Sequence, residues 1–197
     1  MSARADAMAR TRQQIIEAAA DRVRLSAEPL ALMDIAARAA VSRATLYRHF
    51  GSVTDLLDAV AADLLARARY DQLLAALELP DPADALRQVI LVGTGIWAAD
   101  PVLVRNFTSL AAAQPEVLPV VAQRERGRLA AMERLAARLG QAGRLRSGLT
   151  PDGAVDLLLV ITAFAAWDEL VVSRNRTEAE ATAIITDLAI TAVVAAP

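Results

Sequence analysis

The sequence of 197 residues contains no cysteine and no lysine, and its only histidine is His49. Without cysteine the chain has no disulfide, no thiolate nucleophile and no cysteine-ligated zinc. Without lysine it lacks the amine of a Schiff-base enzyme and the phosphate-binding lysine of a P-loop. A single histidine excludes sites that need two, such as the paired Glu-x-x-His motifs of di-iron bundles. We therefore expect no enzyme, no catalytic residue, no metal site and no cofactor.

Glycine and proline are also scarce, with eight of each, whereas 55% of the residues are hydrophobic. Strand-like alternation never persists, and the dominant residues Ala, Leu and Arg favour helices. The sequence therefore predicts an all-α fold of one or two domains. The longest largely apolar run, residues 157–167, is shorter than the roughly 20 residues of a bilayer span, and residues 1–14 lack the apolar core of a secretory signal. We expect a cytoplasmic protein that does not contact a membrane.

Spacing and capping signals predict about nine helices. The first four are expected over residues 10–25, 32–39, 42–50 and 52–79, and the other five begin near residues 82, 101, 116, 151 and 178. Most of these starts carry a side chain that can accept a hydrogen bond from the first free amides of a helix. The expected caps are Ser42, Ser52, Asp81, Asp100, Thr150 and Thr177, with Glu180 completing a capping box.

The charges are distributed unevenly although the net charge is only −2. Residues 1–50 contain eight arginines and five acidic residues, a balance of +3, whereas residues 51–197 contain thirteen arginines and eighteen acidic residues, a balance of −5. A basic head on an acidic body indicates a polyanionic partner at one end. We place the boundary at residue 51, with a small head over residues 1–51 and a larger helical body over residues 52–197.

The head contains two short predicted helices, over residues 32–39 and 42–50, whose lengths and short connection are typical of a helix-turn-helix. In the second helix Leu46 and Phe50 share the buried face, so the outward face centres on Ala44 and Arg48. Arginine, threonine and alanine suit base edges in a major groove, and tyrosine suits a phosphate. From composition alone, the same segment also fits a solvated helix without a function.

The residues Asp34-Ile35-Ala36 and Ala40 to Phe50 resemble the head of the TetR family of bacterial transcriptional repressors. That family has a pattern close to DIA-x-x-AGVS-x-x-TLY-x-HF, followed by a turn and a helix start of the form S-x-x-x-L, here Ser52 to Leu56. The resemblance covers about 25 residues, with the helix-turn-helix motif itself at about residues 31–50. The rest of the chain matches the family only in the number and order of its helices.

The resemblance implies a homodimer that binds double-stranded DNA at a palindromic operator and is released by a small effector. It implies that the second motif helix contacts bases through Arg43, Ala44, Thr45 and Arg48. Phosphate contacts are implied mainly for Ser42, Tyr47 and His49.

Three residues depart from the family pattern. Ala40 stands where the family usually has glycine in the turn, and alanine costs roughly 1 kcal/mol if that residue needs a positive φ. Val53 stands where the family often has a lysine for phosphate. Leu30-Ala31 replaces the usual Ser or Thr cap of the first motif helix. The first two departures bear on turn geometry and DNA affinity, and the third on local stability.

The body is predicted to supply a dimer seam and an effector site. Its last two helices are apolar on nearly every side, so they must be covered all round. One side can pack on its own domain, and the resemblance implies that the other forms a four-helix seam with a second protomer. The predicted seam residues are Leu157, Ile161, Phe164, Ile184 and Leu188. The effector is expected to be small and apolar or amphipathic. The predicted ligand-binding residues are Trp97, Arg105, Asn106, Phe107, Phe164 and Trp167, although aromatic residues at helical spacing more often belong to a core.

Two alternatives remain open. The body of a DNA-binding regulator can serve dimerisation alone and bind no small molecule. The body can also hold the site of a helical enzyme, but no acid–base constellation supports this. Asp168 and Glu169, for example, are adjacent in sequence and therefore face different directions on a helix.

Overall fold

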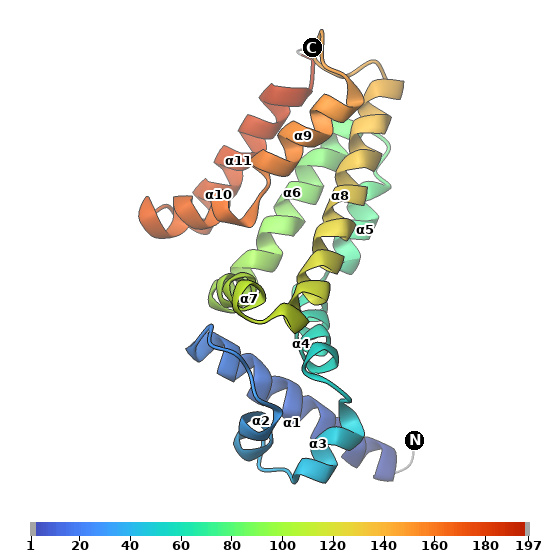
Figure 1. The fold of residues 1–197 in the computed structure, drawn as a ribbon. Helices are drawn as coiled ribbons and strands as arrows, with labels where there is room; N and C mark the ends of the chain where they lie inside the picture. Colours follow the sequence, from blue (N-terminus) through green and yellow to red (C-terminus); the bar gives the residue numbers. More distant parts are fainter. Residues whose placement is uncertain (1–2, 196–197) are drawn as a thin grey trace. The chain divides into compact units, whose positions relative to one another are not determined.

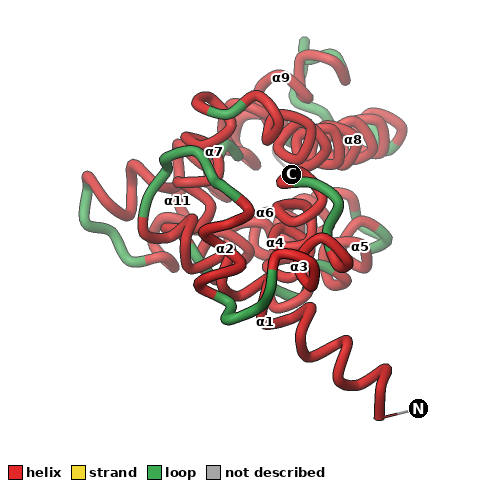
Figure 2. The backbone as a smooth tube through the Cα atoms, turned by 60° about the horizontal axis from the view of Figure 1, so that its bottom comes forward, coloured by secondary structure: helices red, strands yellow, loops and turns green. Residues whose placement is uncertain are grey.

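The structure is a computed structural model that describes residues 3–195. Within that range the chain forms helices joined by short loops and one isolated antiparallel bridge between Leu145 and Val194, with no strand (Figures 1 and 2). The all-α prediction is confirmed. No helix in the described range is both long enough and apolar enough to cross a membrane.

The chain folds into two compact units. The first comprises Met1–Leu65 and Asp100–Arg124, and the second comprises Ala66–Ala99 and Glu125–Pro197. The compact units therefore divide the chain inside the helices α4 (Val53–Arg67) and α8 (Leu118–Gln141), and between α6 (Pro82–Ala99) and α7 (Pro101–Ala113). The functional boundary at residue 51 stays a prediction.

The first unit is a layer of helices around one apolar core. It contains α1 (Ala3–Leu25), α2 (Leu32–Arg38), α3 (Arg43–His49), most of α4, α7, a 3-10 turn over Pro115–Val117 and the start of α8. Apolar side chains from all of these segments, including Val120 at the start of α8, are fully or almost fully buried together. They include Ile15, Ile16, Val23, Ile35, Leu46, Phe50, Leu56, Leu57, Leu103, Leu110 and Val117.

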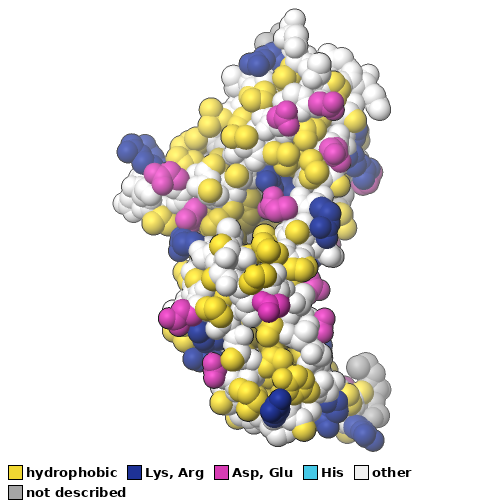
Figure 3. Space-filling view, viewed as in Figure 1, with side chains coloured by type: hydrophobic (Ala, Val, Ile, Leu, Met, Phe, Trp, Pro, Cys, Tyr) yellow, Lys and Arg dark blue, Asp and Glu magenta, His cyan; other side chains and the backbone are white. Residues whose placement is uncertain are grey.

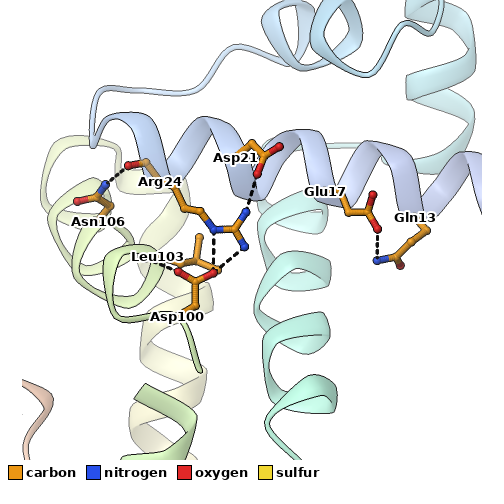
Figure 4. A network of polar contacts seen from close by, with 7 residues as sticks. All are labelled: Gln13, Glu17, Asp21, Arg24, Asp100, Leu103 and Asn106. Carbon is orange, nitrogen blue, oxygen red and sulfur yellow. Dashed lines mark hydrogen bonds and ion pairs between the residues drawn. The ribbon is translucent and has the colours of Figure 1, made fainter. Parts of the chain in front are cut away.

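A polar network ties the carboxyl end of α1 to α7 (Figure 4). The Arg24 guanidinium donates to Asp100 Oδ2 from Nε at 2.8 Å and from Nη2 at 2.6 Å, and to Asp21 Oδ1 at 2.6 Å. Asn106 Nδ2 donates to the carbonyls of Val23 at 2.7 Å and Arg24 at 3.1 Å. These carbonyls belong to the last turn of α1, where a helix has no acceptor partners of its own. Asn106 therefore closes the end of α1 inside the first unit.

The second unit contains α5 (Asp71–Leu77), α6, most of α8, α9 (Pro151–Ile161), α10 (Phe164–Asp168), a π-helical turn over Glu169–Ser173 and α11 (Glu178–Val193). Arg138 from α8 donates to the carbonyls of Leu77, Leu79 and Pro80, and so satisfies the carboxyl end of α5. The unit has its own apolar core. It includes Leu86, Val89, Ile90, Met132, Leu135, Leu139, Leu158, Trp167 and Ile185.

The predicted helix starts are largely confirmed at atomic level. Ser42, Ser52, Asp100 and Thr150 each accept a hydrogen bond from the backbone amide three residues on, at 3.0–3.1 Å. Asp81 accepts from two amides, and Thr177 with Glu180 forms the complete capping box.

Three predicted helix bounds are wrong. The first helix begins at Ala3 and not near residue 10. The helix expected over residues 52–79 is broken into α4 and α5, with Arg69 at φ 58° between them. The helix expected from residue 151 is divided into α9, α10 and the π-helical turn, and at the first division the Thr162 hydroxyl donates to the Leu158 carbonyl at 2.6 Å. Neither break contains glycine or proline, so the sequence offered no signal for it.

Candidate nucleic-acid interface

A tight turn joins α2 to α3. The Ala40 amide donates to the Ala37 carbonyl at 3.1 Å, and the Val41 amide donates to the Ala36 carbonyl at 3.0 Å. This pair of bonds is a Schellman motif, which requires a left-handed residue just past the end of the helix. That residue is Ala40, at φ 52°. The turn predicted from the sequence is therefore present, and an alanine adopts the conformation that glycine adopts at lower cost.

The helix α3 divides into a buried face and an open face. Leu46 and Phe50 are 1% and 3% exposed and belong to the core of the first unit. Of the predicted DNA contacts, Ser42, Arg43, Ala44, Tyr47 and Arg48 are exposed, and Thr45 is half-buried. The residues predicted for base and phosphate contacts thus lie on the open face of α3 and at its amino end, with no acidic side chain on this helix.

Local contacts hold several of these side chains in place. The Arg43 guanidinium lies over the Tyr47 ring, 5.3 Å from its centroid. The hydroxyls of Ser42 and Thr45 are 2.9 Å apart. On the other side of the motif, the Arg12 guanidinium of α1 lies 4.9 Å from the centroid of Phe50. On the face drawn in Figure 3, arginine side chains gather near the end of the first unit that carries α3 and the start of α1. The motif therefore presents positive charge beside neutral donors and acceptors.

His49 is less open than its neighbours. Its side chain is half-buried, and its Nε2 atom has no hydrogen-bond partner among the described residues. Burial, with smaller effects from the positive charges of Arg48 and Arg12, lowers the pKa of His49 below its ordinary value. The imidazole is therefore neutral at pH 7, and its phosphate contact stays a prediction.

The residues predicted to bind an effector fall into both compact units. Trp97, Phe164 and Trp167 form an aromatic cluster in the second unit, with ring centroids 5.8 to 6.2 Å apart. In the first unit, Phe107 is a core residue with 9% exposure, and Asn106 bonds the end of α1. Arg105 also lies in the first unit and interacts with other groups of the chain. The structure therefore brings three of the six predicted residues into contact with one another.

The predicted seam residues lie on a surface that is incompletely covered. Leu188 is 55% exposed, and Leu157, Ile161 and Ile184 are half-buried. Phe164 is half-buried and belongs to the aromatic cluster. A substitution at Phe164 would therefore disturb the cluster as well as the seam, whereas one at Leu188 would not. Val160, which the sequence analysis did not select, is 73% exposed. Apolar side chains are spread over α9 and α11 on the face shown in Figure 3.

The sequence analysis also missed an open groove between α6 and α11 in the second unit. Small or apolar, uncharged polar and charged side chains all line it. The lining includes Leu91, Gly95, Ala98, Ala179, Ala183, Arg87 and Asp187. Small residues at helical spacing on both helices were the available signal, because they let two helices form a shallow channel.

Comparisons with known proteins bear on the motif and on the fold. The family model "Bacterial regulatory proteins, tetR family" matches residues 27–60, a range that includes α2, the turn and α3. The match shows a segment of the TetR type over these residues. The family consists of bacterial regulatory proteins, and the matched segment contains the predicted helix-turn-helix. No curated protein sequence matches the chain at a significant level.

Solved structures of TetR-family proteins share the fold over almost the whole chain. A transcriptional regulator from Agrobacterium tumefaciens is 19% identical, with a TM-score of 0.68 over 95% of this chain and 99% of that one. A TetR transcription regulator from Haloarcula marismortui is 17% identical, with a TM-score of 0.70 over 94% and 99%. The complex of SmeT with triclosan is 19% identical, with a TM-score of 0.71 over 93% and 91%. SmeT is the repressor of the Stenotrophomonas maltophilia multidrug efflux pump SmeDEF.

The departures from the TetR pattern have visible local effects. Ala31 is the N-cap of α2 and provides no side-chain hydrogen bond, as its side chain requires. Val53 begins α4 without the ammonium group that a lysine would place there. Ala40 keeps the left-handed turn in spite of its Cβ. The motif geometry is therefore retained at a cost in local stability.

Proposed function

We propose that the chain is a homodimeric repressor that binds a palindromic operator through α3 and is released by a small molecule. The open face of α3 carries this proposal. Arg43, Ala44, Thr45 and Arg48 meet base edges, because guanidinium, hydroxyl and methyl groups match the donors, acceptors and thymine methyls of a major groove. Ser42, Tyr47 and His49 hold the helix against phosphates.

The uncovered apolar surface of α9 and α11 supports the homodimer. Exposed leucine and valine side chains that lie together are covered in a stable assembly. A second copy covers Leu157, Ile161, Ile184 and Leu188 with the same residues of its own, because a two-fold interface is self-complementary. Two-fold symmetry also sets two recognition helices about 34–36 Å apart, one turn of DNA, and makes the operator palindromic.

The aromatic cluster supports an effector. Trp97 and Phe164 are partly exposed beside the buried Trp167, so the second unit holds a large apolar surface that a small molecule can cover. The complex of SmeT with triclosan shows that a protein of this fold binds a small molecule. Such a ligand releases DNA only if it binds the DNA-free state more tightly than the DNA-bound state.

Genomic footprinting of the full-length protein tests this function. Protection of a palindrome in a promoter region, with two protomers bound per site, is the expected result. Transcription from that promoter should rise when the gene for the chain is deleted. A bound site without two-fold symmetry, or a promoter whose transcription falls on deletion, would contradict the operator or the repressor assignment respectively. Operator release and thermal shift with a metabolite panel then separate an effector-responsive body from one that only dimerises.

A further inference from the structure

Both tryptophans of the chain lie in the aromatic cluster. Trp97 comes from α6, and Phe164 and Trp167 come from the short helix α10. The Trp97 and Phe164 rings meet edge-to-face at 5.8 Å, and the two indoles are 6.2 Å apart. Apolar residues pack against the same core, including Leu73, Ala98, Leu170 and Val171. The cluster is therefore largely apolar, and its most deeply buried polar atom is the Trp167 indole nitrogen.

The N–H group of the Trp167 indole has no hydrogen-bond acceptor among the described residues. Trp167 is 0% exposed, and its Nε1 atom has no hydrogen-bond partner in the described part of the chain. An indole N–H is a donor only, and a buried tryptophan ordinarily gives it an acceptor. A buried donor without a partner loses its bond to water and gains nothing in return. The Trp167 indole N–H is thus a hydrogen-bond donor that no acceptor in the described part of the chain satisfies.

Open space lies beside Gly93, on the helix that carries Trp97. Gly93 stands four residues before Trp97 and therefore on the same face of α6. A Cβ added at Gly93 would meet no atom within 4 Å, and Gly93 is itself half-buried. A ligand that lies over Gly93 can therefore reach the Trp97 ring without displacing backbone.

The helix that carries Trp167 is short and is interrupted on both sides. α10 is five residues long, and it lies between the break at Thr162 and the π-helical turn over Glu169–Ser173. Interruptions of this kind are frequent at functional sites, because the flanking backbone can change its hydrogen bonding without unfolding a long helix. A small shift of α10 can bring the Trp167 N–H to a ligand that covers Trp97 and Phe164.

We infer that the aromatic cluster binds an uncharged, planar, largely apolar molecule that carries a hydrogen-bond acceptor, which Trp167 Nε1–H recognises. The ring system stacks on Trp97 and Phe164. An acceptor such as a ring nitrogen, carbonyl or ether oxygen completes the unused bond, whereas a charged group is excluded by the cost of placing it in apolar surroundings. A ligand without an acceptor leaves the donor unpaired, so it binds less tightly. As an effector class, this inference rests on the proposed function.

Three bicyclic probes of similar size test the inference on the full-length protein at pH 7.5. Quinoline carries an acceptor, naphthalene carries neither an acceptor nor a donor, and indole carries a donor. Calorimetry should show quinoline binding roughly tenfold more tightly than naphthalene, the factor of a typical net hydrogen bond, and indole no more tightly than naphthalene. Equal affinities for quinoline and naphthalene would overturn the inference, and so would no quinoline binding at millimolar concentration.

Nuclear magnetic resonance identifies the donor directly, because the chain has only two indole N–H groups. Saturating quinoline should move the Trp167 indole proton downfield as it forms the bond, and an unmoved resonance would contradict the inference. Trp167→Phe keeps an aromatic ring and removes the donor, so it should bring quinoline and naphthalene to equal affinity. Trp97→Phe is the matched control, which weakens all three probes but keeps their order.

Operator binding separates this inference from the proposed function. If quinoline binds through Trp167 and operator affinity is unchanged, the inference holds and quinoline is excluded as an effector. If a metabolite releases the operator equally from the wild type and Trp167→Phe, the proposed release mechanism holds and the inference fails. Release of the operator by acceptor-bearing compounds from the wild type alone supports both.

Discussion

Two uncovered helical surfaces of this chain differ in their chemistry. The open face of α3 in the first unit exposes Arg43, Tyr47 and Arg48, whereas the outer surface of α9 and α11 in the second unit exposes Val160 and Leu188. A polar, cationic surface is stable in water without a partner, so its partner can bind and dissociate. An apolar surface of this kind is stable only when it is covered. This difference fits the proposed partners, a polyanion that binds α3 transiently and a second protomer that covers α9 and α11 permanently.

The largest effect is expected when the apolar surface is made charged. Leu188→Glu places a carboxylate in the proposed seam, so the protein should become monomeric and lose about 100-fold or more in operator affinity, because the two heads no longer bind together. Sedimentation velocity and fluorescence anisotropy measure the two quantities. Leu74→Glu is the control, because Leu74 on α5 is 53% exposed but lies outside the seam. A Leu188→Glu protein that remains dimeric would remove the seam from this comparison.

The next effect concerns the polar network that holds the first unit. Asp100→Ala removes both the partner of Arg24 and the cap of α7, and should lower the free energy of unfolding by about 2 kcal/mol. Asp58→Ala removes a more exposed ion pair with Arg124 in the same unit and should cost less than about 0.5 kcal/mol. Urea denaturation measures both. Equal effects would show that the network of Figure 4 contributes no more than a surface pair.

A smaller effect is expected at the turn of the motif. Ala40→Gly relieves the left-handed alanine and should raise the free energy of unfolding by about 0.5–1 kcal/mol, even though glycine makes the unfolded chain more flexible. Ala37→Gly changes an exposed helical position of α2 and should lower it by about the same amount. In thermal or urea unfolding, the two variants should change the free energy of unfolding in opposite directions. A loss of stability in Ala40→Gly would contradict the strain at the turn.

The smallest effect is the pH dependence of His49. Because its pKa is lowered in the folded state, the unfolded state takes up the proton first as the pH falls through about 6.5. The wild type should therefore lose stability between pH 7.5 and 5.5, and the loss should level off below the folded pKa. His49→Asn should lose less over the same interval. The difference between the two proteins isolates His49 from carboxylates that titrate lower, and identical pH profiles would count against a lowered pKa.

The sequence predicted the motif well because its signals are local. Ser42 is a cap, Leu46 and Phe50 are one helical turn apart, and both observations fix which face of α3 is open. The sequence raised the condition that Ala40 is strained if its place in the turn needs a positive φ, and its φ is 52°. Each of these features depends on a few neighbouring residues, so spacing alone determines it.

The body was harder to predict because its signals are not local. A helix that is apolar on every side does not reveal which side packs on its own unit, and Val160 was missed for this reason. Asn106 was predicted to bind a ligand, but the structure shows it bonded to the end of α1, 82 and 83 residues away along the chain. The breaks at Arg69 and Thr162 follow from packing and not from glycine or proline.

The central claim is that the open face of α3 reads DNA. Its most direct test is the operator affinity of Arg48→Ala, measured by fluorescence anisotropy at one fixed salt concentration, beside Arg146→Ala, which removes an exposed arginine from the second unit. Both variants lose one positive charge, so they differ only in position. Arg48→Ala should weaken specific binding about 10-fold or more, the cost of one good base contact, and Arg146→Ala should leave it within about twofold. The account would be contradicted if Arg48→Ala bound the operator as tightly as the wild type and still preferred the palindrome over random DNA. Arg48 would then not contact a base, and the open face of α3 would lack its main contact.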